Sequence, residues 1–132
     1  MYHTREEKFY VYSYIEMDLF KTCEKTDVKI YTHKINTFTE IQFIFPERAE
    51  VHASEKEFNG ISIEAKLCIM PKRKQVVIII IKKEDDHISL RSWGFSSIIE
   101  ALGFVSSLVT EKVAPYCDVF EKFMRILEAY KG

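Results

Sequence analysis

The sequence predicts an α+β fold, with a mainly antiparallel sheet of about five to seven strands followed by two C-terminal helices packed on it. Alternation of apolar and polar residues, typical of half-buried strands, recurs in the chain up to residue 92. Within this part, residues 76–81 form an unbroken β-branched run, the pattern of a strand covered on both faces. Apolar residues at helical spacing follow.

Length and composition predict one domain, residues 1–132, in a soluble protein. The 132 residues match the commonest domain size, and no apolar run approaches the ~20 residues that span a bilayer. The charged N-terminus, Met1–Lys8, is unlike a secretory signal. Three widely spaced cysteines, Cys23, Cys68 and Cys117, indicate thiols in a reducing compartment. We therefore expect an intracellular protein, cytoplasmic or nuclear, without membrane association.

The first segment, Lys8–Phe20, has two interpretations. Phe9 and Val11 alternate with polar or tyrosine positions, and the enrichment in Tyr and Val favours a strand. Thr4 followed by Glu7 has the spacing of a capping box, which would begin a helix. The strand is the favoured interpretation, and the helix remains open.

Two further strands are predicted at residues 27–34 and 37–45. Pro46 ends the second strand because it lacks the backbone N–H that a ladder needs. Residues 47–58 are polar and weakly periodic. We interpret them as a connection that contains one short element.

A run of hairpins completes the predicted sheet. Asn59–Gly60 indicates a tight turn because both residue types tolerate positive φ. Residues 61–69 then alternate cleanly and predict a strand with one buried face. After a turn at Pro71–Lys74, residues 75–81 predict the interior strand. The sheet continues after a further turn with Ile88, Leu90 and Ser92.

Two helices end the chain. Ser97 followed by Glu100 is a capping box for the first, and Pro115 suits the first turn of the second. The apolar stripe of the first helix contains Ile98, Leu102, Val105, Leu108 and Val109. The broad apolar face of the second helix contains Val119, Phe120, Phe123, Ile126, Leu127 and Tyr130.

The sequence contains no recognisable catalytic motif. Ser96 and Ser97 lack the flanking glycines of a nucleophile elbow, and the four glycines are too widely spaced for a phosphate loop. The four histidines show no metal-ligand spacing. We expect no catalytic residues, no metal site and no cofactor, and therefore a protein that is not an enzyme.

Two groups of residues are candidate binding sites. Lys72, Arg73 and Lys74 form a basic cluster that suits either phosphate binding or a solvated hairpin tip, although 19 basic and 20 acidic residues give no overall attraction to nucleic acid. In a strand, Tyr10, Tyr12 and Tyr14 point the same way and form a row that suits contact with a partner. Alternatively, these rings cover a second core layer.

The interior strand leads to a prediction about function. Two helices cover only one of its faces, so the other face is covered by curling of the sheet, by the N-terminal segment or by another subunit. We expect a non-enzymatic binding or assembly module that acts through protein–protein contacts and self-associates. One alternative is a nucleic-acid-binding domain that uses the sheet and the Lys72–Lys74 hairpin tip. Another is a small-molecule or lipid-binding cavity between the curled sheet and the last helix.

Overall fold

The computed structural model describes residues 4–12, 15–18, 25–85 and 87–131. Within these ranges the chain forms strands and then helices, which confirms the predicted α+β fold. The elements are β1 (Arg5–Tyr12), β2 (Ile15–Asp18), β3 (Lys29–Ile35), β4 (Phe38–Phe45), β5 (Glu50–Phe58), β6 (Ile61–Met70), β7 (Gln75–Glu84), β8 (His87–Phe95), α1 (Ile98–Thr110) and α2 (Tyr116–Lys131).

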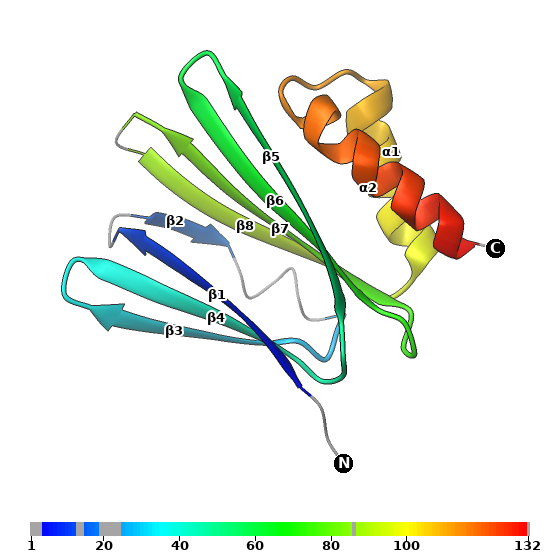
Figure 1. Ribbon diagram of the computed structural model, residues 1–132, viewed down its shortest axis with the longest axis horizontal. Helices are drawn as coiled ribbons and strands as arrows, with labels where there is room; N and C mark the ends of the chain where they lie inside the picture. Colours follow the sequence, from blue (N-terminus) through cyan, green and yellow to red (C-terminus); the bar gives the residue numbers. More distant parts are fainter. Residues whose placement is uncertain (1–3, 13–14, 19–24, 86, 132) are drawn as a thin grey trace.

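The strands form two sheets instead of the one expected. Sheet A has the order β1-β4-β3 and is antiparallel. Sheet B has the order β2-β8-β7-β6-β5 and is antiparallel except for β2, which runs parallel to β8. Figure 1 shows the resulting three layers, with sheet B lying between sheet A and the two helices.

Strand β7 lies at the centre of sheet B and is buried on both faces, as its sequence predicts. Ile78 and Ile80 belong to the core that faces the helices. Ile79 and Ile81 belong to the core that faces sheet A. The second face is covered by sheet A, so the N-terminal segment supplies only part of the cover, through Phe9 and Val11 of β1, and Ile41, Phe43 and Phe45 of β4 supply the rest. Strand β7 therefore gives no reason to expect another subunit.

The interpretation of residues 47–58 as a connection is wrong, because Glu50–Phe58 form the edge strand β5. Its contacts with α2 include polar ones: Lys122 Nζ donates to the Ala53 carbonyl at 3.0 Å, and Lys56 Nζ lies 3.0 Å from Asp118 Oδ2. Because polar side chains of β5 take part in the contact with α2, the strand lacks the apolar alternation on which the sequence prediction depended.

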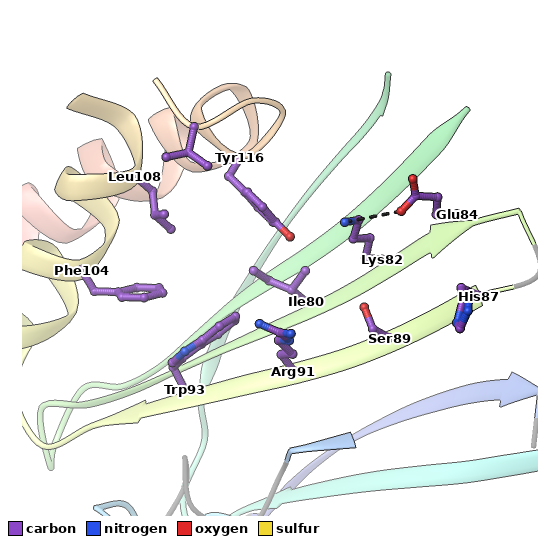
Figure 2. Close-up of a pocket in the computed structure, with 11 residues that line it drawn as sticks. Ile80, Lys82, Glu84, His87, Ser89, Arg91, Trp93, Phe104, Leu108 and Tyr116 are labelled. Atoms are coloured by element: carbon purple, nitrogen blue, oxygen red, sulfur yellow. Dashed lines mark ion pairs between the residues drawn. The ribbon is translucent and has the colours of Figure 1, made fainter. Parts of the chain in front are cut away.

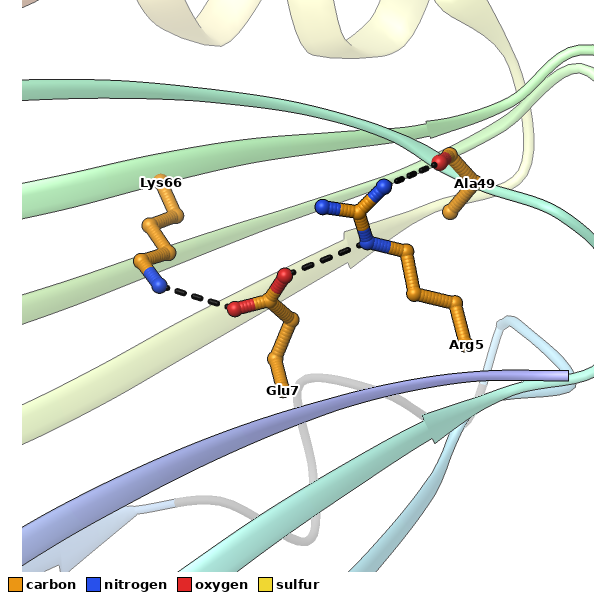
Figure 3. A network of polar contacts seen from close by, with 4 residues as sticks. All are labelled: Arg5, Glu7, Ala49 and Lys66. Atoms are coloured by element: carbon orange, nitrogen blue, oxygen red, sulfur yellow. Dashed lines mark hydrogen bonds and ion pairs between the residues drawn. The ribbon is translucent and has the colours of Figure 1, made fainter.

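The N-terminal segment is a pair of strands, so the helix alternative for Lys8–Phe20 is wrong wherever the structure describes it. The carboxylate of Glu7 does not cap a helix. It accepts hydrogen bonds from Arg5 and Lys66, and Arg5 also donates to the carbonyl of Ala49 (Figure 3). This network connects β1 to sheet B.

The helices begin and pack largely as predicted. The hydroxyl of Ser97 caps α1 by accepting from the Glu100 N–H at 3.2 Å, while the Glu100 carboxylate accepts from the N–H of Ser96, one residue earlier than a capping box requires. Helix α2 buries Val119, Phe120, Phe123 and Leu127 against α1 and sheet B. None of the helices described here is long and apolar enough to cross a membrane.

Candidate functional site

Sheet B extends past the helices at the end that carries the β7–β8 turn (Figure 1). A cavity of about 520 Å³ lies where the helices stop covering these strands. It is lined by β7 and β8 on one side and by α1, the α1–α2 connection and the first residue of α2 on the other. We call it the β7–β8 pocket.

The strand register gives the pocket an apolar end and a polar end. Residues of β7 and β8 that lie opposite one another share a face of the sheet. On the face toward the helices, the pairs from the inner to the outer end are Ile78 with Trp93, Ile80 with Arg91, Lys82 with Ser89, and Glu84 with His87. Successive pairs are about 7 Å apart along the strands. The lining therefore changes from aromatic at the Ile78–Trp93 pair to charged at the next pair, Ile80–Arg91.

Aromatic rings form the inner wall. The ring centroids of Trp93 and Phe104 lie 5.1 Å apart, and those of Tyr116 and Phe120 lie 6.1 Å apart in a stacked arrangement. Phe104 also contacts Phe120, with centroids 6.5 Å apart. Such contacts fix the rings in place. Trp93 is the only tryptophan in the sequence.

Polar side chains converge from both sides of the pocket. Figure 2 shows Arg91, Ser89 and Lys82 rising from the sheet, while the hydroxyl of Tyr116 points down from the helices. Lys82 Nζ lies 3.6 Å from Glu84 Oε2, toward the outer end. In the strand register, Asp18 of β2 lies opposite Arg91. Among the acidic residues whose side chains the structure describes, none forms an ion pair with Arg91.

The tyrosine row is described only in part. Tyr10 lies on the outer face of sheet A, with 60% of its surface exposed. The side chain of Tyr12 and the whole of Tyr14 lie outside the described part of the chain. On the same face, exposed apolar side chains come from the neighbouring strands: Tyr31, Ile35 and Phe38.

The basic cluster lies in the β6–β7 turn, at the opposite end of β7 from the pocket. Lys72, Arg73 and Lys74 are all exposed. Arg73 forms an ion pair with Asp27, and its backbone N–H donates to Glu47 Oε1 at 3.2 Å. These two acidic residues offset part of the positive charge of the turn. Neither the basic cluster nor Tyr10, the member of the tyrosine row whose side chain the structure describes, lines the pocket.

The residues of the β7–β8 pocket were not identified from the sequence. One signal was present: His87, Ser89, Arg91 and Trp93 alternate with the apolar Ile88 and Leu90. Such alternation is equally typical of a solvated strand face, and only the position of the helices makes it one wall of a cavity. In the described part of the chain, no three His, Cys, Asp or Glu side chains are grouped so that they could hold a metal ion.

No protein-family model, curated protein or solved structure matches this chain.

Proposed function

We propose that this protein is a non-enzymatic binding protein that holds a small molecule in the β7–β8 pocket. The observation that carries this proposal is the combination of an aromatic inner wall with convergent polar groups in one cavity of about 520 Å³. Small-molecule sites typically have volumes of about 300–1,000 Å³ and the same combination of apolar lining and few polar groups.

The apolar wall sets the scale of the expected affinity. A ligand that buries about 150 Å² of apolar surface against Trp93, Phe104 and Leu108 gains about 4 kcal/mol at about 25 cal/mol per Å². That gain alone corresponds to a dissociation constant of about 1 mM. Tighter binding therefore requires the polar groups at the other end of the pocket.

Trp93 provides the test, because the only tryptophan of the chain lines the pocket. Titration with the uncharged probe N-phenyl-1-naphthylamine should change the fluorescence of Trp93. Val113→Phe, which places a larger side chain in the pocket lining, should weaken this binding. Ile99→Phe is the matched control, since Ile99 is exposed on α1 and does not line the pocket. Fluorescence that does not respond to the probe would contradict the proposal.

A second candidate function is protein–protein contact through the outer face of sheet A, which the helices do not cover. Tyr10 and Tyr31 are 60% and 52% exposed there, next to the exposed Ile35 and Phe38. Rings exposed on a flat sheet face are typical contact residues of interfaces. A second copy of this chain is the partner that we favour.

Light scattering over a range of concentrations tests self-association. The double variant Tyr10→Ser, Tyr31→Ser should shift the protein toward monomer. Phe58→Ser is the matched control, because Phe58 is an exposed aromatic residue at the β5–β6 turn, away from sheet A. A wild-type protein that stays monomeric at all concentrations would rule out the sheet A proposal and leave the pocket proposal intact.

Nucleic-acid binding has less support. With Arg73 paired to Asp27, only Lys72 and Lys74 of the basic cluster have no acidic partner in the described residues. Two or three phosphate contacts give only weak, salt-sensitive binding. We also propose a reducing intracellular compartment, because Cys68 and Cys117 are free thiols and Cys68 is fully buried.

A further inference from the structure

We infer that two copies of this chain stack the outer faces of their A sheets on one another about a two-fold axis parallel to β4. This inference rests on the second function proposed above, self-association through sheet A. It adds the direction in which the copies stack and the residues that meet. Because β4 is the central strand of sheet A, this axis places β4 over its own counterpart and β1 of one copy over β3 of the other.

The strand register arranges the outer face in rows. Residues that lie directly opposite one another share a face of the sheet. Three rows run across β1, β4 and β3, in this order: Glu6, Ile44 and Lys29; Lys8, Gln42 and Tyr31; Tyr10, Glu40 and His33. A fourth row, next to the β3–β4 turn, is described for Phe38 and Ile35. In Figure 1, sheet B lies on one side of sheet A, and no described element covers the other.

The rows give the face a charged end and an apolar end. Glu6 and Lys29 are exposed at the two edges of the first row. Phe38 and Ile35 are exposed in the fourth row, at the other end of the face. An axis parallel to β4 preserves this order, because each row meets the same row of the second copy. The charged ends then lie together, and so do the apolar ends.

Opposite charges meet in this arrangement. Glu6 of one copy faces Lys29 of the other, and the two-fold symmetry makes this contact occur twice. In the second row, Lys8 faces the ring of Tyr31, a cation–π pair. Stacked sheets are rotated by about 30° relative to one another, and the long side chains of Glu6 and Lys29 span the resulting offset. Within one copy, β4 separates these two residues by about 10 Å, so they interact only weakly.

A two-fold axis across the strands fits the face less well. It would reverse the order of the rows, so that the first row meets the fourth. Lys29 would then face the apolar Ile35 of the second copy, and Ile44 would face Phe38. Glu6 would lie over β1 of the second copy, away from Lys29. Both charges would lose solvent without gaining a partner of opposite sign, which is unfavourable.

Glu40 opposes the inferred arrangement and therefore provides a test of it. It is half-buried on β4, close to the axis, and faces Glu40 of the second copy. Tyr10 and His33, its neighbours in the row, offer donors to both carboxylates. Glu40→Gln removes the like-charge contact and should strengthen self-association about twofold to fivefold. With the axis across the strands, Glu40 would face Gln42, and the same substitution would have little effect.

Charge-swap variants test the contact between Glu6 and Lys29, with sedimentation velocity over a range of concentrations as the readout. Glu6→Lys and Lys29→Glu each place like charges together at both contacts, and each should weaken self-association about tenfold. An equimolar mixture of the two variants should associate about as tightly as the wild-type protein, because each contact of the mixed pair again joins opposite charges. The double variant Glu6→Lys, Lys29→Glu should recover in the same way.

The matched controls are Glu121→Lys and Arg125→Glu, exposed on α2 at the opposite side of sheet B from sheet A. Alone or mixed, these variants should associate as the wild-type protein does. Raised salt should narrow the difference between the wild-type protein and Glu6→Lys, since salt screens exposed charges. Thermal unfolding of each variant checks that the fold is unchanged.

Two results would overturn the inference. The first is a mixture of Glu6→Lys and Lys29→Glu that associates no more tightly than either variant alone, and the second is self-association that Glu40→Gln leaves unchanged or weakens. In either case, loss of self-association in the Tyr10→Ser, Tyr31→Ser variant would leave the proposed sheet A contact standing. A wild-type protein that stays monomeric at all concentrations would remove this inference and the sheet A proposal together.

Discussion

Lys66 Nζ lies 2.8 Å from Glu7 Oε2, and this ion pair joins β6 of sheet B to β1 of sheet A (Figure 3). The second carboxylate oxygen of Glu7 accepts from Arg5 Nε at 3.2 Å. Lys66 Nζ also lies 4.8 Å from the ring centroid of Phe9, a cation–π distance. The side chains of Glu7 and Lys66 are only 14% and 21% exposed. The two sheets are therefore linked by a shielded charge cluster as well as by their apolar faces.

Acid should destabilise the protein partly through Glu7. Burial raises the pKa of this carboxyl, but hydrogen bonds and charge from Lys66 and Arg5 outweigh burial and hold the pKa below its ordinary value of 4.5. Since the pKa is lower in the folded than in the unfolded state, the stabilisation is present above pH 4.5 and is lost as the pH falls through the folded-state pKa.

Glu7→Gln should therefore reduce the free energy of unfolding at pH 7 by about 1–3 kcal/mol, because it leaves Lys66 half-buried without its charge partner. It should also flatten the decrease in stability on the acid side. Denaturant titrations from pH 3 to pH 7 measure both effects. Glu6→Gln, on the exposed side of the same strand, should change neither. A pH profile for Glu7→Gln that parallels the wild-type profile would contradict this account.

The central strand should be equally sensitive on its two faces. Ile78→Ala opens a cavity toward the helices and Ile79→Ala opens one toward sheet A, and each should cost about 2–5 kcal/mol. Denaturant unfolding of the two variants measures these costs. A loss below about 1 kcal/mol for Ile79→Ala would show that sheet A does not pack on this face in solution.

The contact between α2 and the rest of the core should depend strongly on Phe123. This ring is fully buried, with its centroid 5.6 Å from that of Phe120. Phe123→Ala should cost about 3–5 kcal/mol in denaturant titration. Glu121→Ala, at an exposed position of the same helix, should be within about 0.5 kcal/mol of wild type. Similar stabilities for the two variants would contradict the observed packing.

Two glycines should respond in opposite directions to alanine. Gly60 has φ of +80° in the β5–β6 turn, so Gly60→Ala should destabilise the protein by about 1 kcal/mol or more. Gly103 lies within α1, and an added Cβ would meet no atom within 4 Å. Gly103→Ala should therefore stabilise the protein by about 0.5–1 kcal/mol. Comparison of the two thermal unfolding midpoints checks the sign of each effect.

Features that depend on neighbouring residues were predictable from the sequence. The positive φ of Asn59 and Gly60 confirms the predicted turn, and Ile88, Leu90 and Ser92 are buried on one face of β8 as expected. In each case, one turn or one alternation determines the local structure without reference to distant parts of the chain.

Features that depend on distant contacts were not predictable. Strand β5 was not predicted because polar residues such as Lys56 contact α2, and the strand therefore lacks the apolar alternation that identifies a half-buried strand. The separation into two sheets depends on β1 pairing with β4 and β2 with β8, which no local pattern encodes. The β7–β8 pocket is formed by residues of β7 and β8 together with residues of α1 and the start of α2, so it depends on how the helices pack on sheet B. Arg91 and Trp93 therefore look like ordinary strand residues in the sequence.

The pairing of β2 with β8 has a consequence for folding. Strands β5, β6 and β7 each pair with the next strand along the chain, whereas Ile15 of β2 lies beside Ile88 of β8. Closing a long loop costs more conformational entropy than closing a hairpin, so we infer that β5–β8 and the helices assemble first. In pulse-labelled hydrogen exchange, the amides of β6 and β7 should then gain protection before those of β1. Before the N-terminal strands pack on sheet B, Ile79 and Ile81 are exposed to water. We therefore expect the chain to be most prone to aggregation at this stage of folding.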